Sequence, residues 1–565
     1  MKKQGFLKGS AILLGMVFIT KAVGLAYKIP LTHMLGGSGM AYYSGAFAVF
    51  TPLLAAVVSG ICASTARLTA ESLAFGRYAQ LRKIKRCALL AYTAEGLLAA
   101  VLFTALATPL SVSFLHDENA VWTLRALAPS IVFSAVLSAE RGYYEGLRNM
   151  LPTASSEIAE TLIKAVLGLA GAFFVLDRAE KDFLATHGCF GRFFRTAEEA
   201  RAAALPYAAA AAILAGSLAT GCACIYIAVS GRRKGDGITP KLLARDPLTD
   251  SSKEIIRRLF AFSLPIAGAA VITTLTGTID LVTVSRGLKT ALAAGMRVET
   301  SVSGEALPDF MYGSYTGLAL MVTGLVPTFT AMFGKSALPA LTEAWSKGRK
   351  EELSRQIGRL LKLTALTALP CGMLTAAMPK QVLSFLFRGR TDEITAAAPA
   401  LGILGAACIF TSFALPCLTA LQTVGCRAVP ILLMLGGAGI KLAGNLLLIP
   451  LPSLGLRGAA LSTLAAQGFI AVGAVFVLIR RTEARISVSG TVTAPAFAAL
   501  LGTVTALLTW DIPARAGIVH PESRILFAAA VCAGGCVYLS ALWMLDILPK
   551  ERLTAYFFKK FRKTY

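Results

Sequence analysis

Apolar residues gather in blocks of about 20 positions along this 565-residue chain, and short polar segments separate the blocks. A block of this length predicts a helix that crosses the hydrocarbon core of a bilayer. Fourteen spans are expected, at 9–31, 42–66, 88–109, 124–140, 153–176, 203–229, 259–285, 311–333, 363–387, 395–421, 429–450, 457–479, 491–510 and 524–546. The predicted fold class is therefore an all-α polytopic membrane protein.

Composition supports this class and excludes others. Hydrophobic residues make up 56% of the chain and charged residues only 15%, so no large aqueous domain is expected. The net charge of +24 does not indicate nucleic-acid binding, because no basic stretch is interleaved with aromatic residues. Most of the eleven cysteines lie inside apolar blocks and the four histidines are dispersed, so we expect no metal site and no cofactor.

Lysine and arginine are distributed unevenly between the predicted loops. With the N-terminus in the cytoplasm, about 36 of the 55 Lys and Arg residues fall in inner segments and about 13 in outer loops. This bias predicts that both termini are cytoplasmic. It also defines a basic cytoplasmic linker at 231–258 and a basic cytoplasmic tail at 547–565.

An internal repeat appears at an offset of 272 residues. Tyr43-x-Gly45 recurs as Tyr315-x-Gly317, and Glu71 with Gly76-Arg77 recurs as Glu343 with Gly348-Arg349. Six predicted spans separate the copies, so the two halves have the same orientation. We expect an N-lobe at 1–230, a C-lobe at 259–480 and two additional spans within 491–546. Paired lobes around a central cleft are typical of alternating-access transporters.

Charged residues inside the spans are the candidate functional residues, because each costs about 2.5–3.5 kcal/mol at mid-bilayer and is expected to face a partner or a wet cavity. Lys21 and Lys28 share one face of the first span, and Glu157, Glu160 and Lys164 share one face of the fifth. Asp280 lies in the seventh span. Substrate binding is assigned to Lys21, Lys28, Lys164, Lys441 and Asn445, and a coupling or counter-ion role to Glu157, Glu160 and Asp280.

Three alternatives stay open for these residues. Glu160 and Lys164 have the spacing of a structural ion pair within one helix. Lys28 has a long apolar stem that can instead reach the outer interface. Asp280 can be a counter-ion for a lysine of the other lobe or a site for a proton or another cation.

Several segments resemble one known family. These are Thr20-Lys21 to Pro30-Leu31, Arg141-Gly142-Tyr143-Tyr144-Glu145-Gly146, Pro152-Thr153-Ala154, Leu264-Pro265 to Asp280, Tyr312-Gly313 to Pro339, and Lys441-x3-Asn445 with Gly458-Ala459-Ala460. Their order and spacing resemble the stage V sporulation protein B and polysaccharide biosynthesis family. That family is related to lipid II flippases, in the multidrug/oligosaccharidyl-lipid/polysaccharide exporter superfamily.

The resemblance implies a function. It implies a fourteen-span flippase in the bacterial plasma membrane that moves a polyprenyl-diphosphate-linked saccharide, such as the peptidoglycan precursor lipid II, to the outer leaflet. The last two spans would accommodate the lipid tail, and cell-wall synthesis machinery would be a partner. This chain has Lys21 and Tyr27 where the lipid II flippases that it resembles carry arginine. Lysine lacks the two-pronged guanidinium, so the saccharide is left open.

Two other functions are weighed against the flippase. An ion-coupled multidrug antiporter of the same superfamily would need an acidic cavity for cationic drugs, whereas Lys21, Lys164 and Lys441 are basic. A membrane glycosyltransferase would need a catalytic constellation, and the loops contain none. Gly334-Lys335-Ser336 resembles the end of a phosphate loop, but Phe329 replaces its first glycine. We therefore expect a non-enzyme coupled to a proton or sodium gradient, the membrane potential or cargo turnover.

Overall fold

The computed structural model describes residues 6–545 and 547, except for 116, 148, 191, 237, 244–248, 299, 303, 427, 486, 488 and 516–522. Its chain forms two compact units. Unit 1 consists of Met1–Arg286 and Gly304–Gly317, and unit 2 consists of Gly287–Ser303 and Leu318–Tyr565. The lobes predicted from the repeat divide the chain elsewhere, at the linker 231–258, and that lobe assignment stays a prediction.

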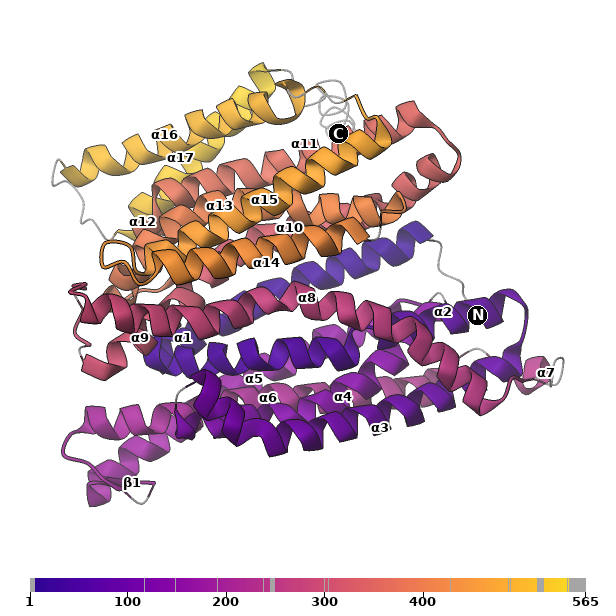
Figure 1. Ribbon diagram of the computed structural model, residues 1–565, viewed down its shortest axis with the longest axis horizontal. Helices are drawn as coiled ribbons and strands as arrows, with labels where there is room; N and C mark the ends of the chain where they lie inside the picture. Colours follow the sequence, from indigo (N-terminus) through magenta and orange to yellow (C-terminus); the bar gives the residue numbers. More distant parts are fainter. Residues whose placement is uncertain are drawn as a thin grey trace, which may run out of the picture. The chain divides into compact units, whose positions relative to one another are not determined.

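Unit 1 is built almost entirely from helices (Figure 1). These are α1 (Phe6–Val58), α2 (Ile61–Ala74), α3 (Tyr78–Leu110), α4 (Val121–Gly146), α5 (Leu151–Thr186), α6 (Ala197–Lys234), α7 (Pro240–Leu243), α8 (Ser252–Ala293) and α9 (Leu307–Ser314). There are also four short helical turns, η1 (Ser111–Leu115), η2 (Glu118–Ala120), η3 (Gly304–Ala306) and η4 (Tyr315–Ala319). The last residues of α8 and of η4 belong to unit 2. Its core is formed where α2, α3, α4 and α8 meet, around residues such as Ile61, Tyr92 and Leu259.

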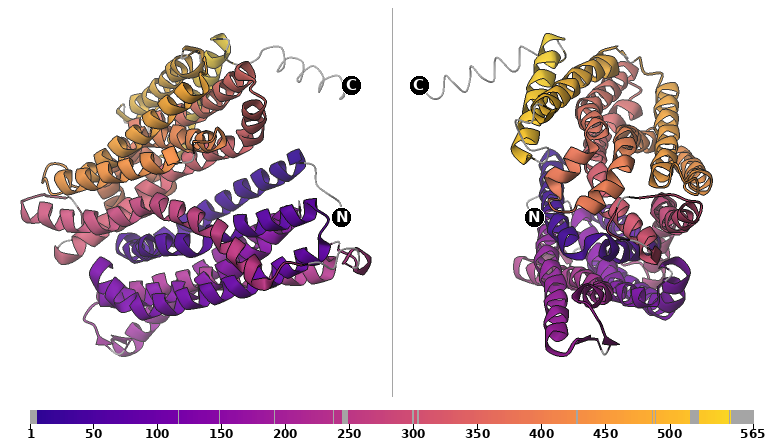
Figure 2. Two further views of the ribbon diagram at one scale, coloured as in Figure 1. Left: turned by 45° about the vertical axis from the view of Figure 1, so that its right-hand side comes forward. Right: turned by 90° about the vertical axis from the view of Figure 1, so that its left-hand side faces the viewer.

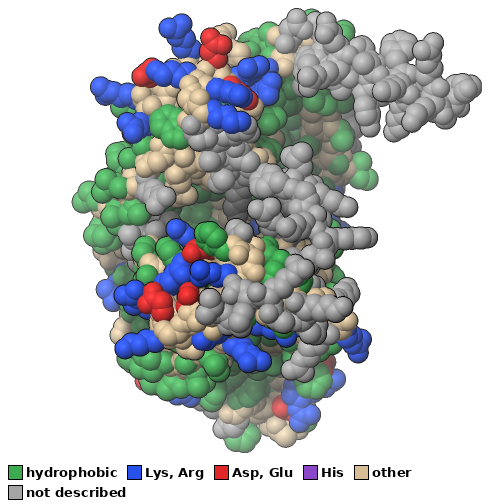
Figure 3. All heavy atoms as spheres, turned by 90° about the vertical axis from the view of Figure 1, so that its right-hand side faces the viewer, with side chains coloured by type: hydrophobic (Ala, Val, Ile, Leu, Met, Phe, Trp, Pro, Cys, Tyr) green, Lys and Arg blue, Asp and Glu red, His purple; other side chains and the backbone are tan. Residues whose placement is uncertain are grey.

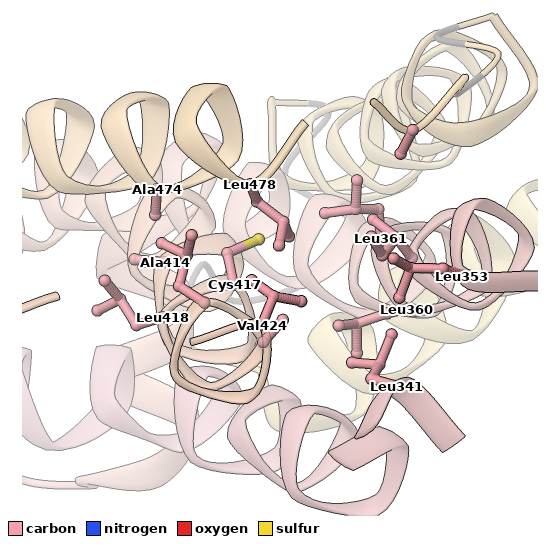
Figure 4. Close-up of a cluster of buried hydrophobic side chains, with 14 of the residues drawn as sticks. Leu341, Leu353, Leu360, Leu361, Ala414, Cys417, Leu418, Val424, Ala474 and Leu478 are labelled. Atoms are coloured by element: carbon pink, nitrogen blue, oxygen red, sulfur yellow. The ribbon is translucent and has the colours of Figure 1, made fainter. Parts of the chain in front are cut away.

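Unit 2 contains the remaining helices. They are α10 (Leu320–Ser346), α11 (Lys350–Ala377), α12 (Pro379–Leu386), α13 (Thr391–Thr423), α14 (Ala428–Leu448), α15 (Leu456–Thr482), the turn η5 (Ser489–Thr493), α16 (Ala494–Arg515) and α17 (Arg524–Met544). Figure 4 shows its main core, in which Leu341, Leu360, Cys417 and Leu478 point toward one another from α10, α11, α13 and α15. Helices α16 and α17 pack against each other and against α11 and α12 (Figure 2).

Helix α1 is too long for a single crossing. Its 53 residues would extend about 80 Å if straight, against a hydrocarbon core of about 30 Å. A kink at Gly36 interrupts it, where the backbone has φ 68° and ψ −173°. A side chain at this position would be strained, so glycine permits the turn. The kink lies between the predicted spans 9–31 and 42–66, which α1 and α2 therefore contain together.

Twelve helical stretches in the described part of the chain have the length and composition to cross a membrane. One of them, Phe18–Leu73, contains the predicted span 42–66 and part of the predicted span 9–31. The predicted span 259–285 lies in α8, where some side chains are outside the description. The all-α, multi-pass membrane class is confirmed. The number fourteen and the orientation of the termini stay predictions, and the tail after residue 547 lies outside the described residues.

Helices α5 and α6 extend past the predicted spans. They have 36 and 38 residues, or about 55 Å each, and are joined by the short hairpin of β1 (Gly188–Cys189) and β2 (Arg192–Phe193). Residues 177–202, expected as an outer loop, are thus largely helical. Ion pairs within one helix, Lys181–Asp177 at 2.7 Å and Arg178–Asp182 at 3.1 Å, suit a solvated helix extension. Burial raises the pKa of the Cys189 thiol, with a further contribution from the charge of Asp182.

Figure 3 shows a face with many basic side chains. It views the chain from the side where α2 and α7 lie in Figure 1, and shows lysine and arginine side chains with fewer acidic ones among them. Hydrophobic side chains flank these basic groups (Figure 3). This is the side that the predicted orientation places in the cytoplasm.

Candidate functional site

Lys164 is the centre of the candidate site in unit 1. It lies on α5 and is partly buried. Its Nζ is 5.3 Å from the ring centroid of Phe47 and 6.0 Å from that of Tyr27, both on α1. Its stem passes over Gly216 of α6, where an added Cβ would be 3.5 Å from Cε. Aromatic rings at these distances attract an ammonium group without neutralising its charge.

Lys28 and Lys21 add further positive charge on α1. Lys28 is partly buried and its ammonium is close enough to Lys164 for the two charges to repel each other. Lys21 lies seven residues earlier and is exposed. Within the described residues, none of these three lysines forms an ion pair with a carboxylate. Unit 1 therefore has like charges near one another that an anionic ligand would stabilise.

Glu160 does not neutralise Lys164. Its Oε2 is 2.9 Å from Nη2 of Arg141 on α4, and its Oε1 accepts a 2.7 Å hydrogen bond from Thr220 on α6. Arg141 also donates to Oγ of Ser156 at 3.0 Å. The alternative of an ion pair between Glu160 and Lys164 within one helix is therefore not what the structure shows.

Arg141 was absent from the predicted site residues. It appeared in the sequence only within the segment Arg141-Gly142-Tyr143 at the predicted inner end of the fourth span, where a basic residue is expected in any membrane protein. Its contact with Glu160 joins two helices, so no spacing within one helix could have indicated it.

Glu157 belongs to a neighbouring group of acidic residues. It is partly buried one turn before Glu160, and its charge acts on Glu145 of α4 and on Cys62 of α2. Cys62 donates a 3.5 Å hydrogen bond to Oε2 of Glu145. Glu157 thus lies on the α2 and α4 side of α5.

Asp280 lies near a second group of carboxylates in unit 1. It is only 2% exposed on α8, and its charge acts on Tyr312 of α9. Tyr312 lines a cavity of about 280 Å³ that Asp117 and Asp309 also line. Ser285 donates a 2.7 Å hydrogen bond to Oδ1 of Asp309, and Tyr42 donates one to Asp117.

The last two predicted residues lie in unit 2, on α14. Lys441 is 5% exposed and Asn445 is fully buried. Oδ1 of Asn445 accepts a hydrogen bond from Ser462 on α15. The structure thus groups Lys28 with Lys164 in one unit and Lys441 with Asn445 in the other. Joint contact of Lys21 and Lys441 with one ligand stays a prediction.

The described residues contain no group of three or more His, Cys, Asp or Glu side chains that could hold a metal ion. The lysine group itself offers positive charge and hydrogen-bond donors. Such a group can bind an anion and hold it beside aromatic rings.

Comparison with known proteins identifies the family. The model of the polysaccharide biosynthesis protein family matches residues 6–345, more than half of the chain. The chain belongs to the polysaccharide biosynthesis protein family. Stage V sporulation protein B of Bacillus subtilis (strain 168) is 22% identical over 561 residues, which cover 98% of both chains. The lipid II flippase MurJ of the same organism is 23% identical over 578 residues, again with 98% of both chains covered.

A solved structure shares the fold of this family member. The lipid II flippase MurJ, in an inward closed conformation, superposes with a TM-score of 0.63 at 12% sequence identity, covering 95% of this chain and 99% of that one. At this identity the likeness establishes the fold alone. It confirms the helical membrane architecture expected from the hydrophobic blocks and from the resemblance to this family.

Proposed function

We propose that this member of the polysaccharide biosynthesis protein family is a flippase that moves a polyprenyl-diphosphate-linked saccharide across the bacterial plasma membrane. It acts as an alternating-access transporter and not as an enzyme. The observation that carries this proposal is the group of Lys21, Lys28 and Lys164 in unit 1, none of which is ion-paired within the described residues.

The physical problem in flipping such a lipid is its diphosphate. An anion cannot enter hydrocarbon without a large desolvation cost, and cations that replace water offset part of that cost. Lys28 and Lys164 repel each other while the site is empty, so binding of a diphosphate relieves that repulsion. Tyr27 and Phe47 keep the Lys164 ammonium within the unit in the meantime.

The carboxylates have supporting roles in this proposal. Glu160 and Arg141 neutralise each other, which leaves Lys164 available for the ligand. Glu157 and Asp280 are counter-ion or coupling groups, with a proton or sodium as the coupling ion. Both termini lie in the cytoplasm, and the flipped lipid passes to the cell-wall synthesis machinery outside.

Lipid II is the first saccharide lipid to test, since two of the similar proteins are lipid II flippases. Lysine binds a phosphate as a point charge and does not form the bidentate contact of arginine. Other polyprenyl-diphosphate saccharides therefore belong in the same assay. A multidrug antiporter is not favoured, because the lysine group would repel cationic drugs.

The test is translocation of fluorescent lipid II, and of a second polyprenyl-diphosphate saccharide, in proteoliposomes containing the purified chain. The wild-type protein should move at least one of them, and Lys21→Ala should slow that movement by tenfold or more. Lys289→Ala removes an exposed lysine from the last turns of α8 and serves as the matched control. Equal rates for Lys21→Ala and wild type would contradict the role of Lys21, and no movement of either lipid by folded protein would contradict the flippase.

A further inference from the structure

A second concentration of positive charge lies in unit 2, at a pocket of about 410 Å³. The pocket is bounded by the end of α12, the turn that follows it, and the first residues of α13 and α17. Four basic residues line it: Lys380, Arg388, Arg390 and Arg524. None of the predicted site residues belongs to this pocket.

Three of these four cations have no acidic partner in the described part of the chain. Arg390 pairs with Glu393, with Nη1 to Oε1 at 3.0 Å. Lys380, Arg388 and Arg524 are exposed and form no ion pair there. The nearby Asp392 of α13 accepts hydrogen bonds from the backbone N–H and the hydroxyl of Ser301. The pocket therefore has a net positive charge that its own residues do not balance.

Backbone dipoles add to this field. Helix α13 begins at Thr391 and helix α17 at Arg524, and both residues line the pocket. These helices have 33 and 21 residues, so their first turns present the positive end of a long dipole and N–H groups without a partner inside the helix. In α17 one of these groups, the N–H of Leu526, donates to the hydroxyl of Ser523 at 3.4 Å. Two helix N-termini beside three unpaired cations favour an anion with several oxygen acceptors, which describes a phosphate group.

The surroundings of the pocket are apolar. The ring of Phe385 on α12 is 5.2 Å from that of Phe527 on α17, and Trp510 of α16 lies against the same ring. Ile525, next to Arg524 and also lining the pocket, is 84% exposed. Exposed apolar side chains continue along α16, at Phe497, Leu500, Val504, Leu508 and Ile512. An anion with hydrocarbon chains could place its headgroup in the pocket and its chains along this surface.

The position of these cations is unusual for a membrane protein. The predicted orientation places the loops 388–394 and 511–523 on the outer side, where lysine and arginine are depleted in most such proteins. Arg388 and Arg390 lie in the first of these loops, and Lys380 and Arg524 lie in the outer halves of the predicted spans 363–387 and 524–546. These two outer-loop arginines and the two span cations line one pocket instead of being dispersed. A group of cations on the side of the membrane where lysine and arginine are usually few indicates a function.

We propose that this pocket binds the phosphate group of a membrane lipid in the outer leaflet. The lysine, the arginines and the helix N-termini hold the phosphate oxygens, and the apolar surface of α16 and Ile525 holds the chains. The inference does not depend on the proposed flippase function, because a lipid can occupy this pocket whether or not the protein moves lipids.

The test is binding of short-chain lipids to the purified full-length chain in neutral detergent. The probes are dihexanoyl phosphatidic acid, inorganic phosphate and dihexanoyl phosphatidylcholine, measured by calorimetry. The protein also carries Lys21→Gln, Lys28→Gln and Lys164→Gln, so that the lysine group of unit 1 does not contribute. Phosphatidic acid should bind at least tenfold more tightly than either other probe.

Variants then locate the site. Lys380→Gln/Arg388→Gln/Arg524→Gln should weaken the binding of phosphatidic acid by tenfold or more. The matched control, Lys289→Gln/Arg297→Gln/Arg457→Gln, removes three exposed cations of unit 2 outside the pocket and should leave the affinity unchanged. Arg388→Lys/Arg524→Lys keeps the charge and should retain binding within a few-fold. Thermal unfolding confirms that each variant is folded.

Two results would overturn the proposal. Unchanged affinity in the folded triple glutamine variant would show that the pocket does not hold the phosphate. Equal affinity for inorganic phosphate and phosphatidic acid would show a site for a free anion and not for a lipid. Because no transport is measured, neither result depends on whether the chain moves lipid II.

Discussion

Lys164 lies twelve residues after Pro152 and Lys441 eleven residues after Pro430, yet their surroundings differ. Lys164 is partly buried, lies over Gly216 and faces two aromatic rings without an ion pair in the described residues. Lys441 is 5% exposed, one turn before the fully buried Asn445, which is bonded to α15. The first arrangement leaves a cation available to a ligand, whereas the second encloses one within a packed unit.

This difference separates two uses of charge in a membrane protein. A lysine that is enclosed with its own partners contributes to packing between helices, and its removal affects folding first. A lysine beside aromatic rings and another lysine is costly until an anion arrives, and its removal affects binding first. We therefore place ligand binding in unit 1 and expect a mainly structural role for Lys441 and Asn445, which narrows the set of substrate-binding residues predicted from the sequence.

The largest effect is expected when both partly buried lysines of unit 1 lose their charge. A hydrogen bond to a charged group contributes about 1.5–3 kcal/mol, so Lys28→Gln/Lys164→Gln should slow lipid translocation by about 100-fold or more. Initial rates in proteoliposomes give the measurement, with Lys289→Gln as the charge control. A double variant that is folded and retains more than a third of the wild-type rate would remove the distinction between the two units.

The second-largest effect is expected at Asn445, which is buried with Lys441 on α14 in unit 2. Asn445→Ala removes the side-chain acceptor of the Ser462 hydroxyl, which keeps the carbonyls of Gly458 and Ala459 as acceptors. The substitution should lower the free energy of unfolding by about 0.5–1.5 kcal/mol. The thermal midpoint should fall while translocation per folded molecule stays near wild type. Leu446→Ala, at a neighbouring side chain that is 59% exposed, controls for truncation on the same helix. Loss of transport with an unchanged midpoint would instead place Asn445 in the ligand site.

A third test asks whether Arg141 keeps Lys164 available. In Arg141→Gln, Glu160 loses its ion pair, and Lys164 four residues later becomes the nearest cation on the same helix face. Translocation should fall about tenfold, because the new pair competes with the phosphate. Arg141→Gln/Glu160→Gln should recover most of the rate, as a double-mutant cycle would show. A double variant no faster than the single one would exclude this competition.

The smallest effect is expected from substitution of two glycines on the helices around Lys164. A Cβ added at Gly168 would lie 2.7 Å from the hydroxyl oxygen of Tyr27, so Gly168→Ala should displace that ring from Lys164. Translocation should fall by a few-fold. At Gly216 the added Cβ would be 3.5 Å from Lys164, an ordinary contact, and Gly216→Ala should have no effect. Equal rates for the two variants would contradict a positioning role for Tyr27.

Much of the fold could be predicted from the sequence, because the bilayer restricts apolar blocks of this length to helices. The kink of α1 could not be placed, since glycine is frequent in membrane helices and only the left-handed backbone at Gly36 distinguishes it. The extension of helices α5 and α6 past the predicted spans was also missed. Residues 177–202 are charged and lack the apolar period, and their helix is supported by ion pairs and by the small core around Phe183 and Cys189.

The candidate site was less predictable than the fold. Spacing within one helix predicted that Glu160 and Lys164 share a face of the fifth span. It could not show that Arg141 of another helix would form an ion pair with Glu160, or that Tyr27 and Phe47 would face Lys164. The basic pocket of unit 2 was missed for the same reason, since its cations come from two segments more than 130 residues apart.

The most direct test of the central claim is the dissociation constant of farnesyl diphosphate for the chain carrying Lys380→Gln/Arg388→Gln/Arg524→Gln, in which the pocket of unit 2 is removed. Adding Lys28→Gln/Lys164→Gln should weaken binding by about 100-fold, while adding Asn445→Ala to folded protein should leave it within a few-fold. Unchanged affinity without the two lysines, or an equal loss with Asn445→Ala, would contradict the claim that unit 1 holds the diphosphate.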